Sequence, residues 1–192
     1  MYQLIFATNN RNKVEEIQSL VGSDFHIIPL KEAGIDKDIP EPHDSLEANA
    51  AEKARTIFTM TQLDCFSEDT GLEIEALHGA PGVKSARYAG ADRDFQANID
   101  KVLMELNNLN HRAARFRTII CLIWKEKEYY FEGICEGRID TKMNGEKGFG
   151  YDPIFIPTGS DKSFAEMNME EKNKFSHRQK AVTQLFNFLR SQ

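Results

Sequence analysis

The first third of the chain shows hydrophobic patterns in the order strand, helix, strand, helix. Short apolar runs over residues 3–7 and 25–29 predict two buried strands. Between them, and again over residues 46–58, apolar residues recur every three or four positions, which predicts amphipathic helices. Ser45 stands where a helix N-cap is expected, and residues 31–43 are rich in Gly and Pro, which predicts a loop.

The middle of the chain predicts extended structure, a turn and one more helix. Residues 64–74 are expected to be extended but interrupted at Gly71, and the Gly and Pro residues of 78–82 predict a turn. A helical period follows, and its expected inner side carries Phe95, Ile99, Val102, Leu103 and Leu106.

The last third predicts an antiparallel hairpin and a closing helix. Residues 115–125 and 129–135 are rich in β-branched and aromatic residues, and a charged tetrad joins them. A glycine-rich loop over 144–152 precedes an amphipathic helix with apolar positions from 181 to 189. Strand–helix alternation followed by a long hairpin predicts a single α/β domain over residues 1–192, with a mixed, twisted sheet and flanking helices.

Composition narrows the class of protein. The net charge of −6 disfavours a nucleic-acid-coating role, because such binding needs a basic face. The three cysteines lie far apart without CxxC spacing, which favours reduced thiols in a cytoplasmic protein. Neither a secretory signal nor an apolar run long enough for a membrane helix is present in the sequence. We therefore expect a soluble cytoplasmic protein that binds neither membrane nor nucleic acid.

The first candidate site segment is the polar turn Thr8-Asn9-Asn10-Arg11-Asn12-Lys13. A strand that enters a helix through such a turn presents backbone N–H groups and the positive end of the helix dipole, which suits phosphate. Lys13 adds a formal charge. The segment contains no glycine and is not a P-loop. The alternative is an ordinary helix start with a solvated lysine.

The second candidate segment carries adjacent carboxylates. Glu68 and Asp69 are predicted to end a strand just before Gly71, and Glu41 lies in the loop before the second helix. Oxygen ligands of this kind suit Mg²⁺, which bridges phosphate oxygens and lowers the pKa of an attacking water. A solvated acidic turn is the alternative.

Two further segments lie in the last quarter of the chain. In Gly148-Phe149-Gly150-Tyr151-Asp152-Pro153, glycines flank an aromatic ring that could stack on a flat ligand, or the aromatics could simply cap the core. The residues Lys172, His177 and Arg178 place cationic and titratable groups close together in sequence. These groups could bind a base edge or phosphates. The alternative is a charged helix start on the surface.

Taken together, the segments resemble the inosine triphosphate pyrophosphatase family, also called Ham1-like. The resemblance covers nearly the whole chain, and its order is more specific than any one motif. The matching motifs are Thr8-x-Asn10-x-x-Lys13, Ala48-Asn49-Ala50-x-x-Lys53-Ala54, Glu68-Asp69-Thr70-Gly71-Leu72, Gly79-Ala80-Pro81-Gly82, Ser85-Ala86-Arg87-Tyr88-Ala89-Gly90, Gly148-Phe149-Gly150-Tyr151-Asp152-Pro153 and Glu171-Lys172-Asn173-x-x-Ser176-His177-Arg178.

The resemblance implies an elongated two-lobed α/β fold with a central cleft, and a homodimer. It also implies Mg²⁺-dependent hydrolysis of ITP, dITP and XTP to the monophosphate and pyrophosphate. This reaction removes non-standard nucleotides from the nucleotide pool. It implies that the segment Thr8–Lys13 binds the triphosphate, chiefly through Thr8, Asn10 and Lys13. The other residues of this segment are Asn9, Arg11 and Asn12. Metal binding falls to Glu41 and Asp69, with Glu68 as a further ligand, and Asp69 is the general base. Substrate contacts are expected from Thr70, Phe149, Gly150, Tyr151, Asp152, Lys172, His177 and Arg178, with Lys53 and Arg87 as secondary phosphate contacts.

Base selectivity follows from donor and acceptor groups. Hypoxanthine and xanthine present a 6-keto acceptor, whereas adenine presents a 6-amino donor, and Lys172 and Arg178 can only donate. A related pyrophosphatase for modified pyrimidine triphosphates is the nearest alternative, and a non-catalytic nucleotide-binding module is the alternative from another class. The carboxylate pair Glu68-Asp69 favours an enzyme, because a binding module has no need of a metal-activating carboxylate.

Overall fold

The computed structural model describes residues 2–21, 24–37 and 39–192 and shows two compact units, each assembled from separated parts of the chain. Unit 1 comprises Met1–Asp69, Thr118–Gly133 and Arg178–Gln192, and unit 2 comprises Thr70–Arg117 and Ile134–His177. Each unit contains its own cluster of buried apolar side chains.

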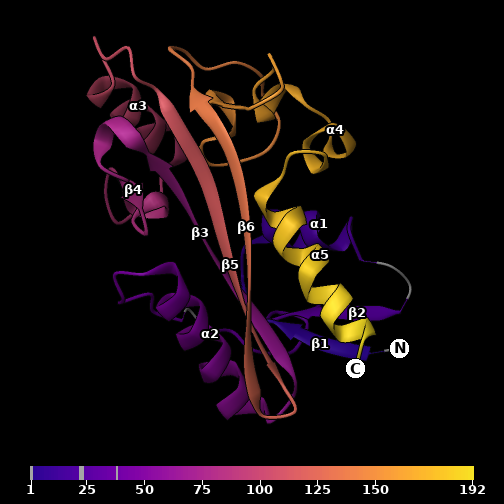
Figure 1. The fold of residues 1–192 in the computed structure, drawn as a ribbon. Coiled ribbons are helices and arrows are strands. Elements are labelled where there is room, and N and C mark those ends of the chain that lie inside the picture. The colour runs from indigo at the N-terminus through magenta and orange to yellow at the C-terminus, as the bar shows by residue number, and fades with distance from the viewer. Residues whose placement is uncertain (1, 22–23, 38) are drawn as a thin grey trace. The chain divides into compact units, whose positions relative to one another are not determined.

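The strands form a mixed sheet, as the sequence predicts (Figure 1). The strands are β1 (Tyr2–Phe6), β2 (Phe25–Pro29), β3 (Cys65–Ile74), β4 (Pro81–Gly82), β5 (Ala113–Trp124), β6 (Lys127–Ile139) and β7 (Phe155–Pro157). Hydrogen-bonded neighbours follow the order β2-β1-β3-β5-β6-β7, with β4 paired to β3. β1 runs parallel to both β2 and β3, whereas the β3–β4 and β6–β7 pairs are antiparallel. The α/β class with a mixed sheet and flanking helices is confirmed.

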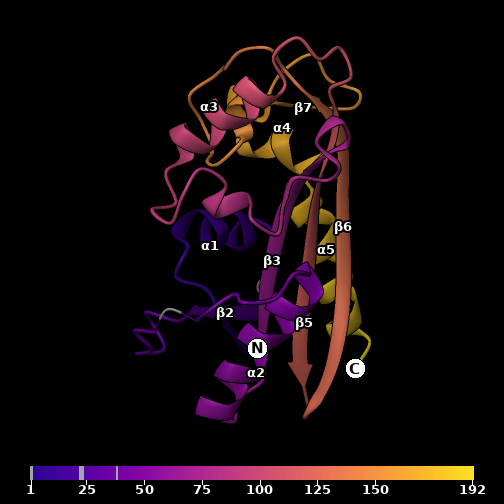
Figure 2. The same ribbon diagram turned by 90° about the vertical axis from the view of Figure 1, so that its left-hand side faces the viewer.

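Unit 1 is built on the parallel strands at the start of the chain. Phe6 on β1 lies in register with Phe66 on β3, and their rings stack with centroids 4.5 Å apart. The helix α5 (His177–Arg190) contributes the apolar positions predicted for it, and all of them are buried in this core: Ala181, Val182, Leu185, Phe186 and Leu189. In Figure 2, α5 and the helix α2 (Leu46–Thr61) lie on opposite sides of the strands.

Two helices of unit 1 begin at side-chain caps. Asn10 caps α1 (Arg11–Gln18) by accepting from the backbone N–H groups of Asn12 and Lys13. Ser45 caps α2 by accepting from the N–H of Ala48, which confirms the cap predicted from the sequence. The predicted loop over 31–43 is confirmed except at Asp38, which lies outside the described residues.

The hairpin of β5 and β6 is longer than the sequence patterns suggest. A two-residue turn at Lys125 and Glu126, both with positive φ, joins the strands in place of the predicted charged tetrad. The N–H of Lys125 donates to the carboxylate of Asp64 at 2.8 Å, which holds the turn against the residue before β3.

In unit 2, the prediction of a break at Gly71 was wrong. β3 continues through this residue because the missing side chain admits β4: a Cβ on Gly71 would lie 2.7 Å from the carbonyl oxygen of Gly82. Gly71 therefore marks a close approach of two backbones and leaves the strand intact. The predicted turn over residues 78–82, which follows β3, includes the left-handed residues His78 and Gly79.

The helix α3 (Phe95–Glu105) of unit 2 differs from the prediction at its first residue. Ile99 and Val102 are buried as predicted, together with Leu106 just beyond the helix. Phe95 shares their side of the helix by spacing, yet it remains 42% exposed. The short helix α4 (Met169–Asn173), absent from the sequence predictions, begins at a capping box between Asn168 and Glu171.

Candidate active site

The turn between β1 and α1 is organised by its own side chains. Thr8 accepts from the N–H of Asn10 through its hydroxyl at 3.2 Å, and the Asn10 carbonyl oxygen caps the helix. Asn9 donates to the backbone oxygen of Lys37, and both Asn9 and Arg11 are exposed. Thr8 and Asn10 therefore shape the turn in this structure, and the half-buried Lys13 supplies its charge.

Glu68 lies at the centre of a buried charge network in unit 1. Arg178 donates to both of its carboxylate oxygens, each at 2.8 Å, and the Lys13 ammonium lies 3.0 Å from one of them. The remaining nitrogen of the Arg178 guanidinium donates to Glu16 on α1. Two basic side chains, Arg178 and Lys13, thus converge on a Glu68 carboxylate that is fully shielded from solvent, and Glu16 shares the guanidinium.

Opposite charges govern the ionisation of this network. Burial disfavours charged Glu68, but the charges of Arg178 and Lys13 outweigh it and hold its pKa well below the usual range. Burial likewise opposes the charge on Arg178, but Glu68 and Glu16 raise its pKa overall. Glu68 and Arg178 are therefore an ion pair at neutral pH.

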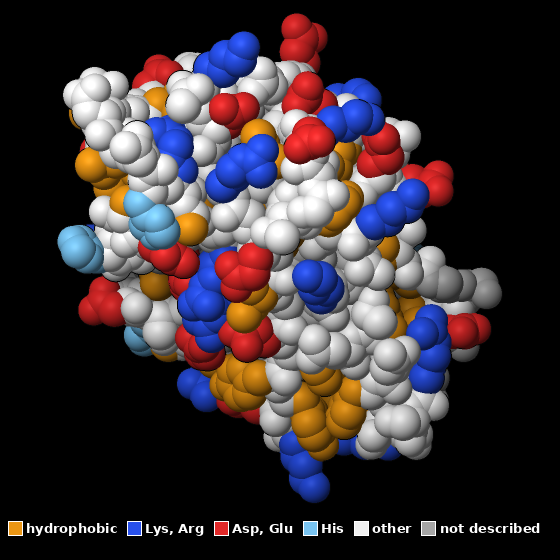
Figure 3. Space-filling view, turned by 45° about the horizontal axis from the view of Figure 1, so that its top comes forward, with side chains coloured by type: hydrophobic (Ala, Val, Ile, Leu, Met, Phe, Trp, Pro, Cys, Tyr) orange, Lys and Arg blue, Asp and Glu red, His pale blue; other side chains and the backbone are white. Residues whose placement is uncertain are grey.

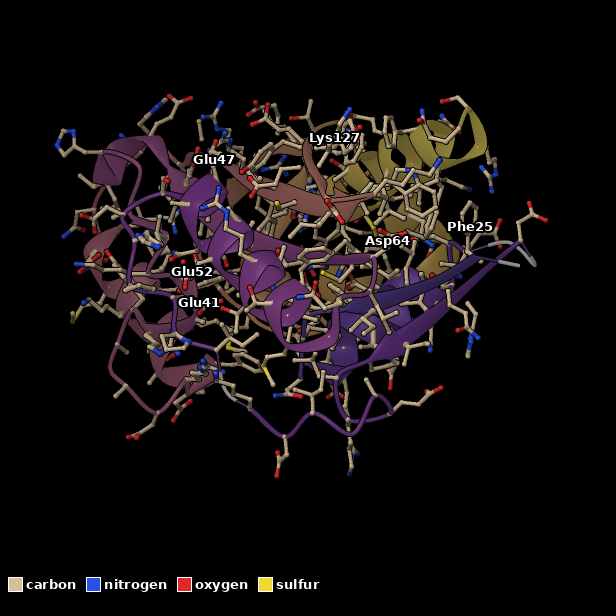
Figure 4. All side chains as sticks on the ribbon, turned by 90° about the horizontal axis from the view of Figure 1, so that it is seen from below. Phe25, Glu41, Glu47, Glu52, Asp64 and Lys127 are labelled. Carbon is tan, nitrogen blue, oxygen red and sulfur yellow. The ribbon has the colours of Figure 1, made fainter. Side chains whose placement is uncertain are left out.

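A second cluster in unit 1 joins the other two predicted carboxylates through one lysine. The Lys53 ammonium on α2 donates to Glu41 at 2.6 Å, to Asp69 at 3.2 Å and to the backbone oxygen of Glu68 at 2.8 Å. Glu41 reaches it from the loop beside α2 (Figure 4). Because one oxygen of Glu41 and one oxygen of Asp69 both contact the Lys53 nitrogen, these two carboxylates lie close to each other.

Burial and charge act on this cluster in opposite directions. Burial lowers the pKa of Lys53, but Asp69 and Glu41 raise it overall. For Asp69, burial raises the pKa, and the neighbouring charges of Lys53 and Lys13 only partly oppose this effect. A carboxylate with a raised pKa accepts protons more readily near neutral pH, which suits a general base.

The predicted metal ligands fit a sparsely coordinated hard cation. Across the described residues, no group of three or more His, Cys, Asp or Glu side chains is placed to hold a metal ion. Mg²⁺ commonly takes one or two protein carboxylates and completes its shell with water and substrate phosphates. Glu41 and Asp69 meet that requirement, whereas the oxygens of Glu68 already contact Arg178 and Lys13.

Unit 2 brings together the residues predicted to contact the base. The carboxylate of Asp152 accepts from the Lys172 ammonium at 2.6 Å and from the N–H of Phe149 at 2.9 Å. The same ammonium lies 5.3 Å from the centre of the Phe149 ring. Gly148 has a positive φ, and a side chain there would overlap the Asp152 carboxylate. The glycine-rich loop is thus folded around Asp152 and leaves Phe149 half exposed.

The remaining predicted residues occupy different settings. Tyr151 is buried and donates to the backbone oxygen of Ser85, so it holds the loop from within the core. His177 is also buried, and its ring stacks on Phe116 with centroids 4.7 Å apart. Thr70 is half-buried, Gly150 adopts a positive φ, and Arg87 lies exposed at the end of a short 3₁₀ helix.

The sequence predictions missed Glu16, the second carboxylate on Arg178. It is buried on α1, three residues after Lys13 and therefore on the same side of the helix. The sequence did contain a signal for Glu16. It is a carboxylate three residues after a candidate phosphate-binding lysine and next to the apolar Ile17.

Comparisons with known proteins identify the family of the chain. A family model described as the Ham1 family matches residues 4–188. The chain belongs to the Ham1 family. The family resemblance drawn from the sequence motifs is therefore confirmed.

Two related Ham1 proteins have curated names. A dITP/XTP pyrophosphatase of Porphyromonas gingivalis is 50% identical over 98% of both chains. One from Flavobacterium psychrophilum is 46% identical over 98% of this chain and all of its own.

Solved Ham1 structures share the fold. A HAM1 protein from Coxiella burnetii superposes with a TM-score of 0.91 at 36% identity over the full length of both chains. The Ham1 protein of Staphylococcus aureus gives 0.89 at 35% identity over 98% of both.

Proposed function

We propose that this Ham1 protein hydrolyses the non-standard purine nucleoside triphosphates dITP, XTP and ITP to the monophosphate and pyrophosphate. The reaction class is that of the relatives named dITP/XTP pyrophosphatases. The observation that carries the proposal is the convergence of Glu41 and Asp69 on Lys53, with Lys13 beside Glu68 in the same unit. Carboxylates and lysines together supply what attack at a phosphorus requires: a cation site, a base and positive charge.

The residues of unit 1 are assigned to the triphosphate. Thr8 and Asn10 fix the turn at the positive end of α1, so that the Lys13 ammonium faces the phosphates. Lys53 keeps Glu41 and Asp69 close together and adds positive charge against the leaving pyrophosphate. Asp69 accepts the proton of the attacking water, because its pKa is raised whereas that of the neighbouring Glu68 is lowered.

We assign Glu41 and Asp69 as the protein ligands of Mg²⁺. When bound, the ion neutralises phosphate charge and activates water. Glu68 is better assigned as the anchor that positions Lys13 and Arg178, because both of its oxygens contact Arg178.

The residues of unit 2 are assigned to the base. Lys172 offers its protons to a 6-keto oxygen and faces the 6-amino group of adenine without a bond. Asp152 orients that ammonium and Phe149 stacks on the ring, with Thr70, Gly150, Tyr151 and His177 around them. Buried donor–acceptor mismatches of this kind discriminate by a factor of roughly 10⁴. Arg178, which belongs to unit 1, is proposed to contact the base edge or the phosphates, and Arg87 is proposed as a secondary phosphate contact.

Two properties of the whole protein are also proposed. We infer a homodimer, which multi-angle light scattering on the purified chain would test, and a cytoplasmic location. The helices in the described ranges are all too short or too polar to cross a bilayer. Acidic and basic side chains lie intermixed on the face drawn in Figure 3, and the net charge of −6 does not favour nucleic acid as a partner.

The deciding experiment measures pyrophosphate release from dITP, XTP, ITP, GTP and ATP, each with Mg²⁺ and with EDTA. We expect fast, Mg²⁺-dependent release from the first three. Asp69→Asn should bind nucleotide and lose turnover. The matched variant Asp64→Asn, which removes a half-buried carboxylate that accepts from the N–H of Lys125, should keep its turnover. Mg²⁺-independent binding without turnover in the wild type would indicate a binding module instead.

A further inference from the structure

Phe95 occupies an unusual position in unit 2. It is the first residue of α3, four and seven positions before the buried Ile99 and Val102, so it shares the apolar side of the helix. A phenylalanine at such a position normally contributes fully to the core. Here Phe95 remains 42% exposed, so a large aromatic residue on the apolar side of the helix is left partly open to solvent.

The exposed ring lies beside the predicted base-stacking residue. The centroids of Phe95 and Phe149 are 6.3 Å apart, with ring planes inclined by 48°. This spacing is at the loose end of aromatic pairing, where rings touch through edges rather than faces. The Lys172 ammonium lies 5.3 Å from the same Phe149 ring, so a charged donor and two aromatic surfaces meet there.

Phe95 is held in place by its helix and by the preceding loop. Asp94 caps α3 by accepting from the N–H of Ala97. The buried amide of Asn98 donates to the backbone oxygen of Ala86 and accepts from the N–H of Ala89, at 3.1 and 2.7 Å. The start of the helix is thus fixed to residues 86–89, and the ring presents a preorganised surface.

We propose that Phe95 is a second aromatic contact for the purine base, opposite or beside Phe149. A purine has two π faces and gains from each aromatic ring that covers one. The assignment rests on the proposed function, because it names a further base-contacting residue for the same substrate. Phe95 contributes affinity for any purine base, and Lys172 chooses among purines.

Substitution at Phe95 separates base contact from phosphate contact. In Phe95→Ala and Phe95→Leu, we expect the KM for dITP to rise roughly fivefold or more while kcat stays near wild type. Inhibition by tripolyphosphate, which has no base, should be unchanged. Leucine preserves most apolar packing, so a loss in Phe95→Leu reports stacking rather than support of the fold.

Met104→Ala is the matched control. Met104 is 69% exposed on the same helix, nine residues later and therefore on the opposite side. Its removal should leave the KM for dITP unchanged.

A fluorescence experiment reads the contact directly. In Phe95→Trp, the introduced indole should be quenched by inosine monophosphate and not by pyrophosphate. The wild type, whose single tryptophan Trp124 is buried in unit 1, provides the baseline. Normal turnover with unchanged KM in both Phe95→Ala and Phe95→Leu, and no quenching, would overturn the role of Phe95 and leave the proposed function intact. A wild type that neither binds nor cleaves purine triphosphates would overturn both.

Discussion

Two arginine–glutamate pairs in unit 1 share a bidentate geometry and differ in burial. Arg178 donates to Glu68 through two nitrogens, each at 2.8 Å, with side chains 2% and 0% exposed. Arg55 donates to Glu128 at 2.5 and 2.8 Å, with side chains 56% and 30% exposed. Replacing each arginine with methionine therefore compares the loss of a bidentate pair in a buried and in a more exposed setting, and Arg178→Met also removes the contact with Glu16.

The expected costs differ severalfold. Arg178→Met leaves the carboxylates of Glu68 and Glu16 buried without their guanidinium, and breaking a buried pair in this way costs about 3–5 kcal/mol. Lys13, 3.0 Å from Glu68, offsets part of the loss and favours the lower end of that range. Arg55→Met should cost about 1 kcal/mol or less, because solvent screens the exposed pair.

Urea unfolding followed by tryptophan fluorescence provides the assay. Trp124 is the only tryptophan of the chain and lies in the apolar core of unit 1, so its signal reports the unit that contains both pairs. Arg178→Lys should fall between the wild type and Arg178→Met, because a lysine keeps the charge but not the planar fork. If Arg178→Met loses no more stability than Arg55→Met at unchanged m-value, the buried network does not stabilise unit 1 as reasoned here.

Three further outcomes are expected. Gly148→Ala should cost roughly 1–3 kcal/mol more than Gly150→Ala in thermal unfolding, because both residues have positive φ but only a Cβ at 148 meets a carboxylate; equal costs would contradict the close approach. Lys172→Ala should reduce the preference for ITP over ATP by more than tenfold in pyrophosphate-release assays while leaving inhibition by pyrophosphate unchanged, and equal losses for both nucleotides would remove it as the base reader. Burial raises the pKa of Cys65 and Cys121 to about 12, so a thiol reagent at pH 8 should label neither before urea unfolds the chain; rapid labelling of the native protein would show that these thiols are accessible.

Local patterns predicted local structure well. Three features follow from residues that are close neighbours in the sequence: the Ser45 cap, the strand Phe25–Pro29 and the apolar side of α5. Periodicity and capping chemistry act over such short stretches of chain. The failures arose where distant segments meet. Gly71 looked like a break because its partner Gly82 is not a sequence neighbour, and Phe95 looked like core because helical spacing does not show where a core ends.

The candidate site shows the same division. Four polar segments indicated residue types that suit phosphate, metal and base, and the family resemblance ordered them; these roles stay predictions. Which of these residues pair with one another could not be predicted, because the partners are distant in sequence. Arg178 and Glu68 are 110 residues apart, and Lys53 and Asp69 are 16 residues apart. Which carboxylate contacts a lysine and which an arginine is decided by the parallel strands and capped helices that carry them.

The division of the chain into two units has a consequence for how the protein can be taken apart. The chain passes from one unit to the other at Asp69–Thr70, Arg117–Thr118, Gly133–Ile134 and His177–Arg178. The first three of these points fall inside β3, β5 and β6, and the fourth lies at the start of α5. No single contiguous stretch of the gene encodes either unit, so a truncated fragment would carry severed strands. Separating the unit proposed to bind phosphate from the unit proposed to bind the base would require rejoining the segments of each in a new order with designed linkers.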